Sequence, residues 1–378
     1  MSFKVYKFRI YPTKAQETVL EQTLETCRRV YNKTLALRKD IYEKEHRSIS
    51  LFETHKLLTQ WKKEDPIYLK QVNSQVLQNV QYRVDLAFKS FFRRVKQGKI
   101  PGYPRFKGIG RYDSITYPQL GVEFKLKSET VNLSKIGKVK VHQHREVEGN
   151  PKTCTVLKTY TGKWFISICC EQVMKIKPER EFKSVGIDLG VISLCTLSNG
   201  DEVQPPRYLI QDEKILAKAQ RKLSAAEKGS KLRSKRRKIV AHIHEKISNK
   251  RKDFHEKLSL SLVQTYSFIV FEDLKVDEMV QKPDCYVEKY ILDAAWSQLV
   301  TKTQHKAEEA GATVVLVNPC NTTKMCSQCR TLVPKERDEM VHNCPVCGLT
   351  LGRDHNAAIN ILRLGLQSVG LTPRCSPI

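Results

Sequence analysis

Two short cysteine pairs constrain this chain more than any other stretch, because four thiolates at this spacing are suited to a shared metal. The pairs are Cys326 with Cys329 and Cys344 with Cys347, each in the form Cys-x-x-Cys. The pattern is close to that of four-cysteine zinc sites, in which four sulfurs surround one ion. A redox pair is the alternative, but two neighbouring pairs satisfy one metal and neither has a thioredoxin-like sequence around it. We therefore predict one structural Zn²⁺, which would supply about 10 kcal/mol or more to a ribbon too small to fold alone.

The charge of the chain restricts its partners. Its 378 residues carry 66 Lys and Arg against 40 Asp and Glu, a formal net charge of +26, and the basic residues recur in nearly every segment. A polyanion is the expected partner, and nucleic acid fits better than a membrane, because no apolar run approaches the roughly 20 residues of a transmembrane helix. The start lacks a signal-peptide core, and most cysteines outside the two pairs lie singly in apolar contexts. We expect an intracellular protein in a reducing compartment.

The first half of the chain predicts a small β-barrel with a helical insertion. Residues 3–10 alternate between apolar and basic side chains, as a half-buried strand does. A helical pattern begins at Thr13, which has capping-box spacing to Gln16. Helical periodicity returns around 51–63 and from about 73 to 96. Short β-like runs separated by turns occupy 100–168. Because the isolated first strand needs partners, we assign it to this barrel.

Two basic segments admit two interpretations each. The segment 103–107 interleaves aromatic and basic side chains, which suits stacking on bases, but a Pro/Gly turn with solvated charges explains it equally well. The run 231–238 lies within a long polar helical stretch, about 211–263. A solvated helix face is the simple explanation of this run, and on so basic a chain we favour a surface that follows phosphates.

From residue 183 onward strands and helices alternate, which predicts an α/β domain around a mixed sheet. Asp188 lies in the apolar, β-prone run 184–190. Buried carboxylates need a partner or a metal, although a turn residue at a strand end is an alternative. A second strand, 267–274, ends in Glu272 and Asp273, and only one of these can face Asp188 because side chains alternate along a strand. Asp354 starts an amphipathic helix and on its own could be an N-cap.

Together, Asp188, Glu272 and Asp354 suggest two-metal phosphodiester hydrolysis on a chain that binds a polyanion. Carboxylate oxygens suit Mg²⁺, which keeps open positions for water and phosphate oxygens. Two ions about 3.5 to 4 Å apart activate the attacking water and stabilise the leaving oxygen. In this hypothesis Asp188 bridges the ions, with Glu272 on one and Asp354 on the other.

The same residues carry a family resemblance. The chain resembles TnpB, the RNA-guided nucleases of insertion sequences that are related to type V CRISPR effectors, and the match runs nearly end to end. Two positions depart from the family pattern: Arg330 replaces a usual Gly after the first cysteine pair, and Gly352 stands where many relatives have Asp. Neither departure removes an expected ligand. The matching segments are 9–13, 104–107, 186–190, 271–274, both cysteine pairs, and 354–358.

The resemblance implies a multidomain α/β plus β-barrel fold. A wedge barrel would carry an inserted helical recognition lobe, followed by a RuvC-like RNase H fold with an inserted zinc ribbon. The expected parts are the first barrel strand (1–11), the helical lobe (12–99), the rest of the barrel (100–182), the first part of the nuclease domain (183–320), the zinc ribbon (321–350), and the last part of the nuclease domain with a tail from about Gly365 (351–378).

The resemblance also implies an activity. It is magnesium-dependent cleavage of double-stranded DNA that pairs with a guide RNA from the transposon end, next to a short motif that the protein reads. Asp188, Glu272 and Asp354 would hold two Mg²⁺, and the four cysteines one Zn²⁺. We expect a monomer with one RNA in the prokaryotic cytoplasm, bound to the nucleoid when on DNA, with no membrane partner.

Two alternatives remain open. Nuclease-dead relatives are RNA-guided repressors, but they lack one or more of the acids. A DNA transposase could use the same three acids for strand transfer.

Overall fold

The computed structural model describes residues 2–121, 124–127, 129–172, 180–280, 285–336 and 339–371. The chain divides into two compact units, Met1–Lys175 and Ile176–Ile378, and each is described by itself. Among the helices in the described ranges, none is long and apolar enough to cross a membrane. The end of the expected tail, residues 372–378, lies outside the described residues.

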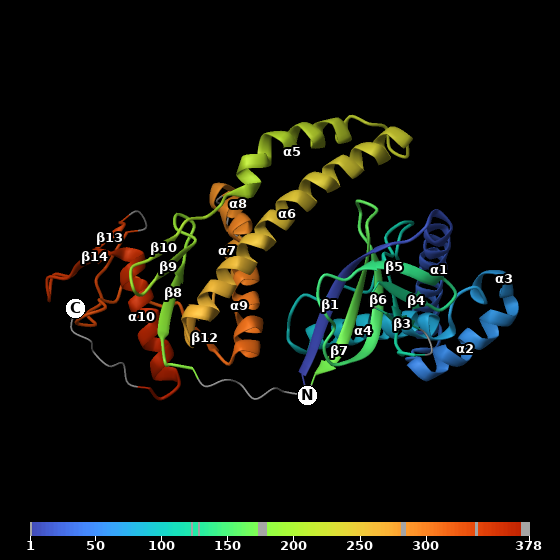
Figure 1. Ribbon diagram of the computed structural model, residues 1–378, viewed down its shortest axis with the longest axis horizontal. Helices are drawn as coiled ribbons and strands as arrows, with labels where there is room; N and C mark the ends of the chain where they lie inside the picture. The colour runs from blue at the N-terminus through green and yellow to red at the C-terminus, as the bar shows by residue number, and fades with distance from the viewer. Residues whose placement is uncertain are drawn as a thin grey trace. The chain divides into compact units, whose positions relative to one another are not determined.

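The first unit is built on a seven-stranded antiparallel sheet that forms a nearly closed barrel, in the order β2-β6-β7-β1-β5-β4-β3 (Figure 1). The first strand pairs with two strands that follow the helices in sequence, as predicted. Side chains alternate along it, so that Tyr6, Phe8 and Ile10 are buried while Phe3 and Val5 are exposed. The strands are β1 (Ser2–Tyr11), β2 (Ser114–Tyr117), β3 (Phe124–Leu126), β4 (Thr130–Leu133), β5 (Gly137–His142), β6 (Asn150–Lys158) and β7 (Trp164–Gln172).

Four helices lie between β1 and β2 in sequence. Thr13 and Gln16 form the predicted capping box at the start of the first helix, which runs to Glu45. The apolar faces of the first and last of these helices share one core with the barrel. The bounds are α1 (Lys14–Glu45), α2 (Leu51–Glu64), α3 (Pro66–Leu69) and α4 (Ser74–Lys96).

The second unit contains a five-stranded mixed sheet in the order β10-β9-β8-β11-β12. The last three strands in this order are parallel, and the first two run antiparallel to their neighbours. This matches the predicted mixed α/β sheet. The strands are β8 (Ser184–Leu189), β9 (Cys195–Leu197), β10 (Glu202–Val203), β11 (Phe268–Glu272) and β12 (Thr313–Val317), with a separate hairpin of β13 (Val341–Asn343) and β14 (Thr350–Gly352).

The expected helical stretch 211–263 is two helices joined by residues 225–230, and Figure 1 shows them as a long hairpin. The break has a local cause. Gly229 has φ +91, and Ser230 caps the second helix by accepting from the backbone N–H of Arg233. The helices of this unit are α5 (Tyr208–Ser224), α6 (Lys231–Thr265), α7 (Val276–Val280), α8 (Cys285–Ala294), α9 (Trp296–Ala310) and α10 (Arg353–Ser368).

Helix α10 packs directly on the sheet, and two glycines permit the approach (Figure 1). A Cβ on Gly186 of β8 would lie 2.2 Å from the carbonyl oxygen of Ala358, and a Cβ on Gly365 would lie 2.3 Å from a methyl of Val270 in β11. The prediction that a tail begins near Gly365 is therefore wrong, because this glycine lets the last turns of the helix contact β11.

Candidate active site

Asp188 and Glu272 lie on adjacent parallel strands near the same sheet edge. In the observed register, Gly186 pairs with Val270 and Ile187 with Phe271. One further step along both strands places Glu272 beside Asp188. The two side chains are 8% and 7% exposed, so both carboxyl groups are largely removed from water. The carboxyl ends of parallel strands are the usual place for a ligand site in an α/β sheet.

The structure resolves the choice between Glu272 and Asp273. Phe268 and Val270 share one face of β11 with Glu272 and pack against α10. Phe271, on the other face, belongs to the core on the opposite side of the sheet. Glu272 is buried and Asp273 is exposed. Glu272 therefore shares the α10 side of the sheet with Asp188.

Asp354 reaches the same edge from α10. It is one turn before Ala358, whose carbonyl oxygen contacts Gly186, and Gly186 lies two residues before Asp188 on the same strand face. Asp354 is not the N-cap, because that position is Gly352 and no side chain caps this helix. Its Oδ1 accepts a hydrogen bond from Nε of Arg353 over 2.9 Å.

The three carboxylates interact electrostatically. Burial raises the pKa of Asp188 well above its usual range, and the charges of Glu272 and Asp354 raise it further. Burial also raises the pKa of Glu272, with a contribution from Asp354. Like charges this close and this buried disfavour full ionisation. A divalent cation is the counter-charge that such a set of oxygen donors can accept.

The acids are spread more widely than the cysteines. Within the described ranges, only the cysteine group has all its ligand atoms within 4.8 Å of one another. The three carboxylates thus do not form the compact shell of a single ion.

Thr322 holds the carboxylate of Glu272. Its Oγ1 donates to Oε1 of Glu272 over 2.6 Å, and the hydroxyl opposes the rise in the pKa of that acid. The backbone carbonyl of Thr322 in turn accepts from Nδ2 of Asn360 on α10 over 2.9 Å. Sequence reasoning missed Thr322, because a single threonine in a loop carries no spacing signal.

The four predicted cysteines come together in a compact group with all Sγ atoms within 4.8 Å. Sγ of Cys326 lies 3.6 Å from that of Cys347, and Sγ of Cys329 lies 3.4 Å from that of Cys344. A tetrahedron with Zn–S bonds of about 2.3 Å has edges of about 3.8 Å, so the donor set fits zinc. Hydrogen bonding to Thr331 lowers the pKa of the Cys329 thiol to about 6, which favours the thiolate that binds metal.

Two asparagines dock the first cysteine pair on α10. Oδ1 of Asn356 accepts from the backbone N–H of Ser327 over 2.9 Å, and its Nδ2 donates to the carbonyl of Met325 over 2.8 Å. Asn360 donates to the same carbonyl over 2.6 Å. Both asparagines are buried, at 0% and 2% exposure. Two polar residues four apart on an apolar helix face are the sequence signal of this contact.

In the first unit, the segment 103–107 packs on two helices, and this packing bears on neither interpretation of its aromatic and basic side chains. The ring of Tyr103 packs edge-on against Phe88 and Phe91, with centroids 5.7 and 5.6 Å away. The backbone N–H and carbonyl of Lys107 are both bonded to the side chain of Asn32. The segment is thus fixed against α1 and α4.

Three known family profiles match the chain. OrfB_IS605, described as a probable transposase, matches 167–282, and the TNB domain of Cas12f1-like proteins matches 296–361. A helix-turn-helix domain of OrfB_IS605 proteins matches 1–47. In this structure that last segment contains β1 and α1, so it is a strand and a helix and not a pair of helices.

Similar proteins extend over nearly the whole chain. A candidate RNA-guided DNA endonuclease of Streptomyces pristinaespiralis is 34% identical over 371 residues, which cover 97% of this chain and 90% of that protein. InsQ of Escherichia coli K12, described in the same way, is 31% identical over 377 residues, which cover 96% and 92%.

Among solved structures, the Cas12f1 protein in a complex with sgRNA and target DNA has a TM-score of 0.59 at 15% identity and covers 95% of this chain and 98% of its own. The mini-RNA-guided endonuclease Cas_phi3 has a TM-score of 0.52 at 10% identity, with 100% and 94% covered. These likenesses concern the fold. Sequence identity above 30% along nearly the full length is the stronger finding, and it shows that the chain belongs to the TnpB family of insertion-sequence proteins.

Proposed function

We propose that this TnpB-family chain, an RNA-guided DNA endonuclease of an insertion sequence, cleaves DNA by metal-dependent hydrolysis at Asp188, Glu272 and Asp354. One observation carries the proposal. The three carboxylates arrive from β8, β11 and α10 at one sheet edge, where burial and the charges of Glu272 and Asp354 raise the pKa of Asp188, and burial and the charge of Asp354 raise that of Glu272. Protein stability alone gives no reason to gather three acids, whereas a site for divalent cations does.

In this proposal the oxygens of Asp188, Glu272 and Asp354 hold two Mg²⁺. When bound, such ions activate a water as the nucleophile and stabilise the leaving oxygen of the phosphodiester. Asp188, beside Glu272 and within the field of Asp354, would be the ligand that serves both ions. Thr322 orients the Glu272 carboxylate, and Arg353 offers a guanidinium next to Asp354.

The substrate we infer is double-stranded DNA that pairs with a guide RNA, next to a short motif read by the protein. The relatives from Streptomyces and Escherichia coli are described as RNA-guided DNA endonucleases, and Cas12f1 was solved with sgRNA and target DNA. The net charge of +26 suits such partners. We propose one chain for each guide RNA.

We also assign the parts of the fold. Residues 1–11 and 100–182 form the wedge barrel and 12–99 its helical recognition lobe. Residues 183–320 and 351–378 form a RuvC-like nuclease domain, and 321–350 form a ribbon braced by one Zn²⁺ on the four cysteines. The zinc has no catalytic part in this proposal, because four protein sulfurs leave no position for water.

Expression with a transposon end tests the function. RNA that co-purifies with the chain would be sequenced, and its guide used to design a plasmid target with varied flanking sequence. We expect Mg²⁺-dependent breaks only in guide-matched plasmids with one flanking motif, and no breaks with Asp188→Ala although RNA and target binding persist.

Two results would contradict the proposal. RNA-free protein that joins transposon ends would identify a transposase. Guide-matched binding by the wild-type chain without any cleavage would identify an RNA-guided repressor in spite of its three acids.

A further inference from the structure

Arg353, the residue before Asp354, ties the start of α10 to the ribbon of residues 321–350. Its backbone N–H donates to the carbonyl of Met340 over 2.8 Å, and its Nη1 donates to the carbonyl of Glu339 over 3.4 Å. Nε of the same guanidinium donates to Oδ1 of Asp354. The two side chains of this ion pair are 21% and 18% exposed, so water screens their charges only in part. Arg353 is therefore a fixed cation at the candidate active site.

The charge of Arg353 acts on a second acid as well. Burial, Glu272 and Asp354 raise the pKa of Asp188, and the charge of Arg353 opposes this rise. A guanidinium that stabilises the ionised forms of Asp188 and Asp354 also repels any other cation that binds to them. Arg353 thus competes electrostatically with a divalent ion for the same carboxylates.

Lys335 of the ribbon is a second cation in this neighbourhood. Its Nζ is buried and has no hydrogen-bond partner among the residues that the structure describes. Burial lowers the pKa of Lys335 and the charge of Arg353 lowers it further, whereas Glu339, Cys326 and Asp354 raise it. The ammonium therefore lies within the field of Asp354 but is not bonded to it. A buried cation in this position would be stabilised by an anion that reaches it.

Together the two cations offset much of the charge of the acids. Three carboxylates and two cations, all ionised, leave one net negative charge. Two divalent ions would make such a site strongly positive unless an anion joined them. A DNA phosphodiester supplies an anion of the right kind, because its oxygens are ligands that Mg²⁺ accepts.

We propose that Arg353 and Lys335 are positioning residues that keep the affinity of the three acids for divalent ions low until a DNA phosphate enters the site. The ion pair of Arg353 with Asp354 carries the inference. With the phosphate in place, its charge offsets the two cations, so that ion binding and DNA binding favour each other. This inference rests on the proposed function, because that function supplies the DNA and the ions.

Metal titration of the full chain, freed of RNA and with any bound zinc retained, tests the inference. Mn²⁺ is the probe, because it takes the same oxygen ligands as Mg²⁺ and its free fraction can be followed by electron paramagnetic resonance. Arg353→Met and Lys335→Met should each bind Mn²⁺ about tenfold more tightly than the wild type, since each removes one positive charge beside the ions. Arg353→Lys, which keeps the charge, should bind as the wild type does. Asp188→Ala should lose this binding, which assigns it to the three acids.

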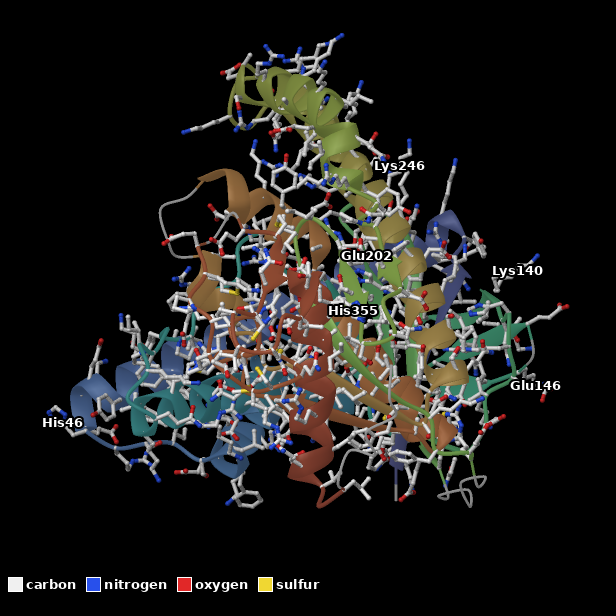
Figure 2. All side chains as sticks on the ribbon, turned by 90° about the vertical axis from the view of Figure 1, so that its left-hand side faces the viewer. His46, Lys140, Glu146, Glu202, Lys246 and His355 are labelled. Carbon is white, nitrogen blue, oxygen red and sulfur yellow. The ribbon has the colours of Figure 1, made fainter. Side chains whose placement is uncertain are left out.

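Lys246→Met is the matched control. It removes the same charge from the same unit, but Lys246 is exposed on α6, and Figure 2 shows it apart from His355, the neighbour of Asp354. This variant should bind Mn²⁺ as the wild type does.

Cleavage of guide-matched DNA tests the part played by the phosphate. The Mg²⁺ concentration for half-maximal rate should differ less between Arg353→Met and the wild type than their Mn²⁺ affinities do without DNA, because the phosphate offsets the guanidinium. Equal differences with and without DNA would overturn the coupling.

The inference fails if Arg353→Met and Lys335→Met, both folded by circular dichroism, bind Mn²⁺ no more tightly than the wild type. It also fails if Arg353→Lys or Lys246→Met gains as much affinity as Arg353→Met. Loss of zinc from Lys335→Met would overturn the role of Lys335, because its partner would then be the cysteine group. The titration is made without DNA, so its outcome is separate from the proposed function. Variants that bind Mn²⁺ as expected, in a chain that never cuts guide-matched DNA, would contradict that function alone.

Discussion

The hydroxyl of Thr322 donates a 2.6 Å hydrogen bond to Oε1 of Glu272 at the buried edge of the second unit. Thr322 is itself 3% exposed, and its carbonyl is held by Asn360 of α10. The helix that carries Asp354 therefore also fixes, through one threonine, the orientation of an acid on β11. This makes Thr322 a positioning residue of the candidate active site.

Thr322→Val tests this relationship, because valine keeps the shape and removes the donor. Hydrogen bonds to charged groups contribute about 1.5–3 kcal/mol, so we expect kcat for cleavage to fall about tenfold to a hundredfold, with little change in KM for target DNA. The concentration of Mg²⁺ needed for half-maximal rate should rise. Thr322→Ser should restore most of the rate. A valine variant that cuts at the wild-type rate would show that Glu272 needs no such support.

Asp188→Asn should stabilise the metal-free chain. The pKa of Asp188 is higher in the folded chain than in the unfolded chain. The stability that this carboxyl contributes is therefore fully present below the unfolded pKa and is lost as pH rises through the folded pKa. At neutral pH the buried charge therefore destabilises the fold. Removal of this charge should raise Tm in EDTA by about 2–4 °C for each kcal/mol recovered.

Thermal unfolding with and without Mg²⁺ between about pH 5 and 8 checks this expectation. Mg²⁺ should raise the Tm of the wild type at neutral pH and have little effect on Asp188→Asn. Glu202→Gln, on exposed β10 (Figure 2), is the control and should show the wild-type response. An asparagine variant less stable than the wild type in EDTA would argue against a destabilising buried charge.

The sequence predicts the periodic and tightly spaced features of this fold well. The pairing of β1 with later strands follows from the fact that a lone strand needs partners. The cysteine group follows from ligand spacing. That Asp188, Glu272 and Asp354 lie near one another was also predictable, because acids at the ends of neighbouring strands meet at one sheet edge.

Features that depend on tertiary contacts could not be predicted. The sequence does not show which face of the sheet α10 covers. In the structure α10 packs on Phe268 and Val270, which lie on the same face of β11 as Glu272. The contact of Thr322 with Glu272 joins residues 50 apart in sequence and leaves no local pattern. Gly365 suggested the start of a tail because glycine near a terminus often ends a helix. The sequence does not show that β11 packs against this glycine.

Gly186→Ala should separate α10 from the sheet. The added methyl would lie 2.2 Å from the carbonyl oxygen of Ala358 and 2.5 Å from the amide nitrogen of Leu362, and neither backbone atom can move without shifting the helix. We expect a loss of about 2–4 kcal/mol in the free energy of unfolding and a larger relative loss of cleavage, because Asp354 moves with α10. Gly102→Ala, where a Cβ meets nothing within 4 Å, is the control. Equal stability and activity of both variants would contradict close packing at Gly186.

Removal of zinc should impair cleavage through α10. Elemental analysis of the purified chain should give one zinc per chain, and Cys344→Ser should lose it. Because Asn356 and Asn360 hold the backbone of Met325 beside the first cysteine pair, an unfolded ribbon would leave these buried amides without partners. Zinc-depleted protein should then cut more slowly at saturating Mg²⁺. Absence of zinc from active protein would rule out the structural ion.

The basic α5–α6 hairpin offers a test of phosphate contacts. Nη1 of Arg233 donates to the carbonyl of Ala226 over 2.6 Å, so this arginine closes the hairpin. Lys235, Arg237 and Lys238 are exposed on α6 and remain available for phosphates. Their triple replacement by alanine should reduce the slope of log affinity for guide RNA against log salt by about two to three, without lowering Tm.

Lys257→Ala is the matched control for the hairpin variant, because this exposed lysine lies on the same helix but is already paired with Asp253 over 2.7 Å. Its loss should leave the salt slope unchanged. The salt slope distinguishes the two explanations. A general loss of positive charge would lower the affinity of both variants, whereas each lost phosphate contact releases about one counterion fewer and so lowers the slope. A triple variant with the wild-type slope for both guide RNA and target DNA would show that the run 231–238 is only a solvated helix face.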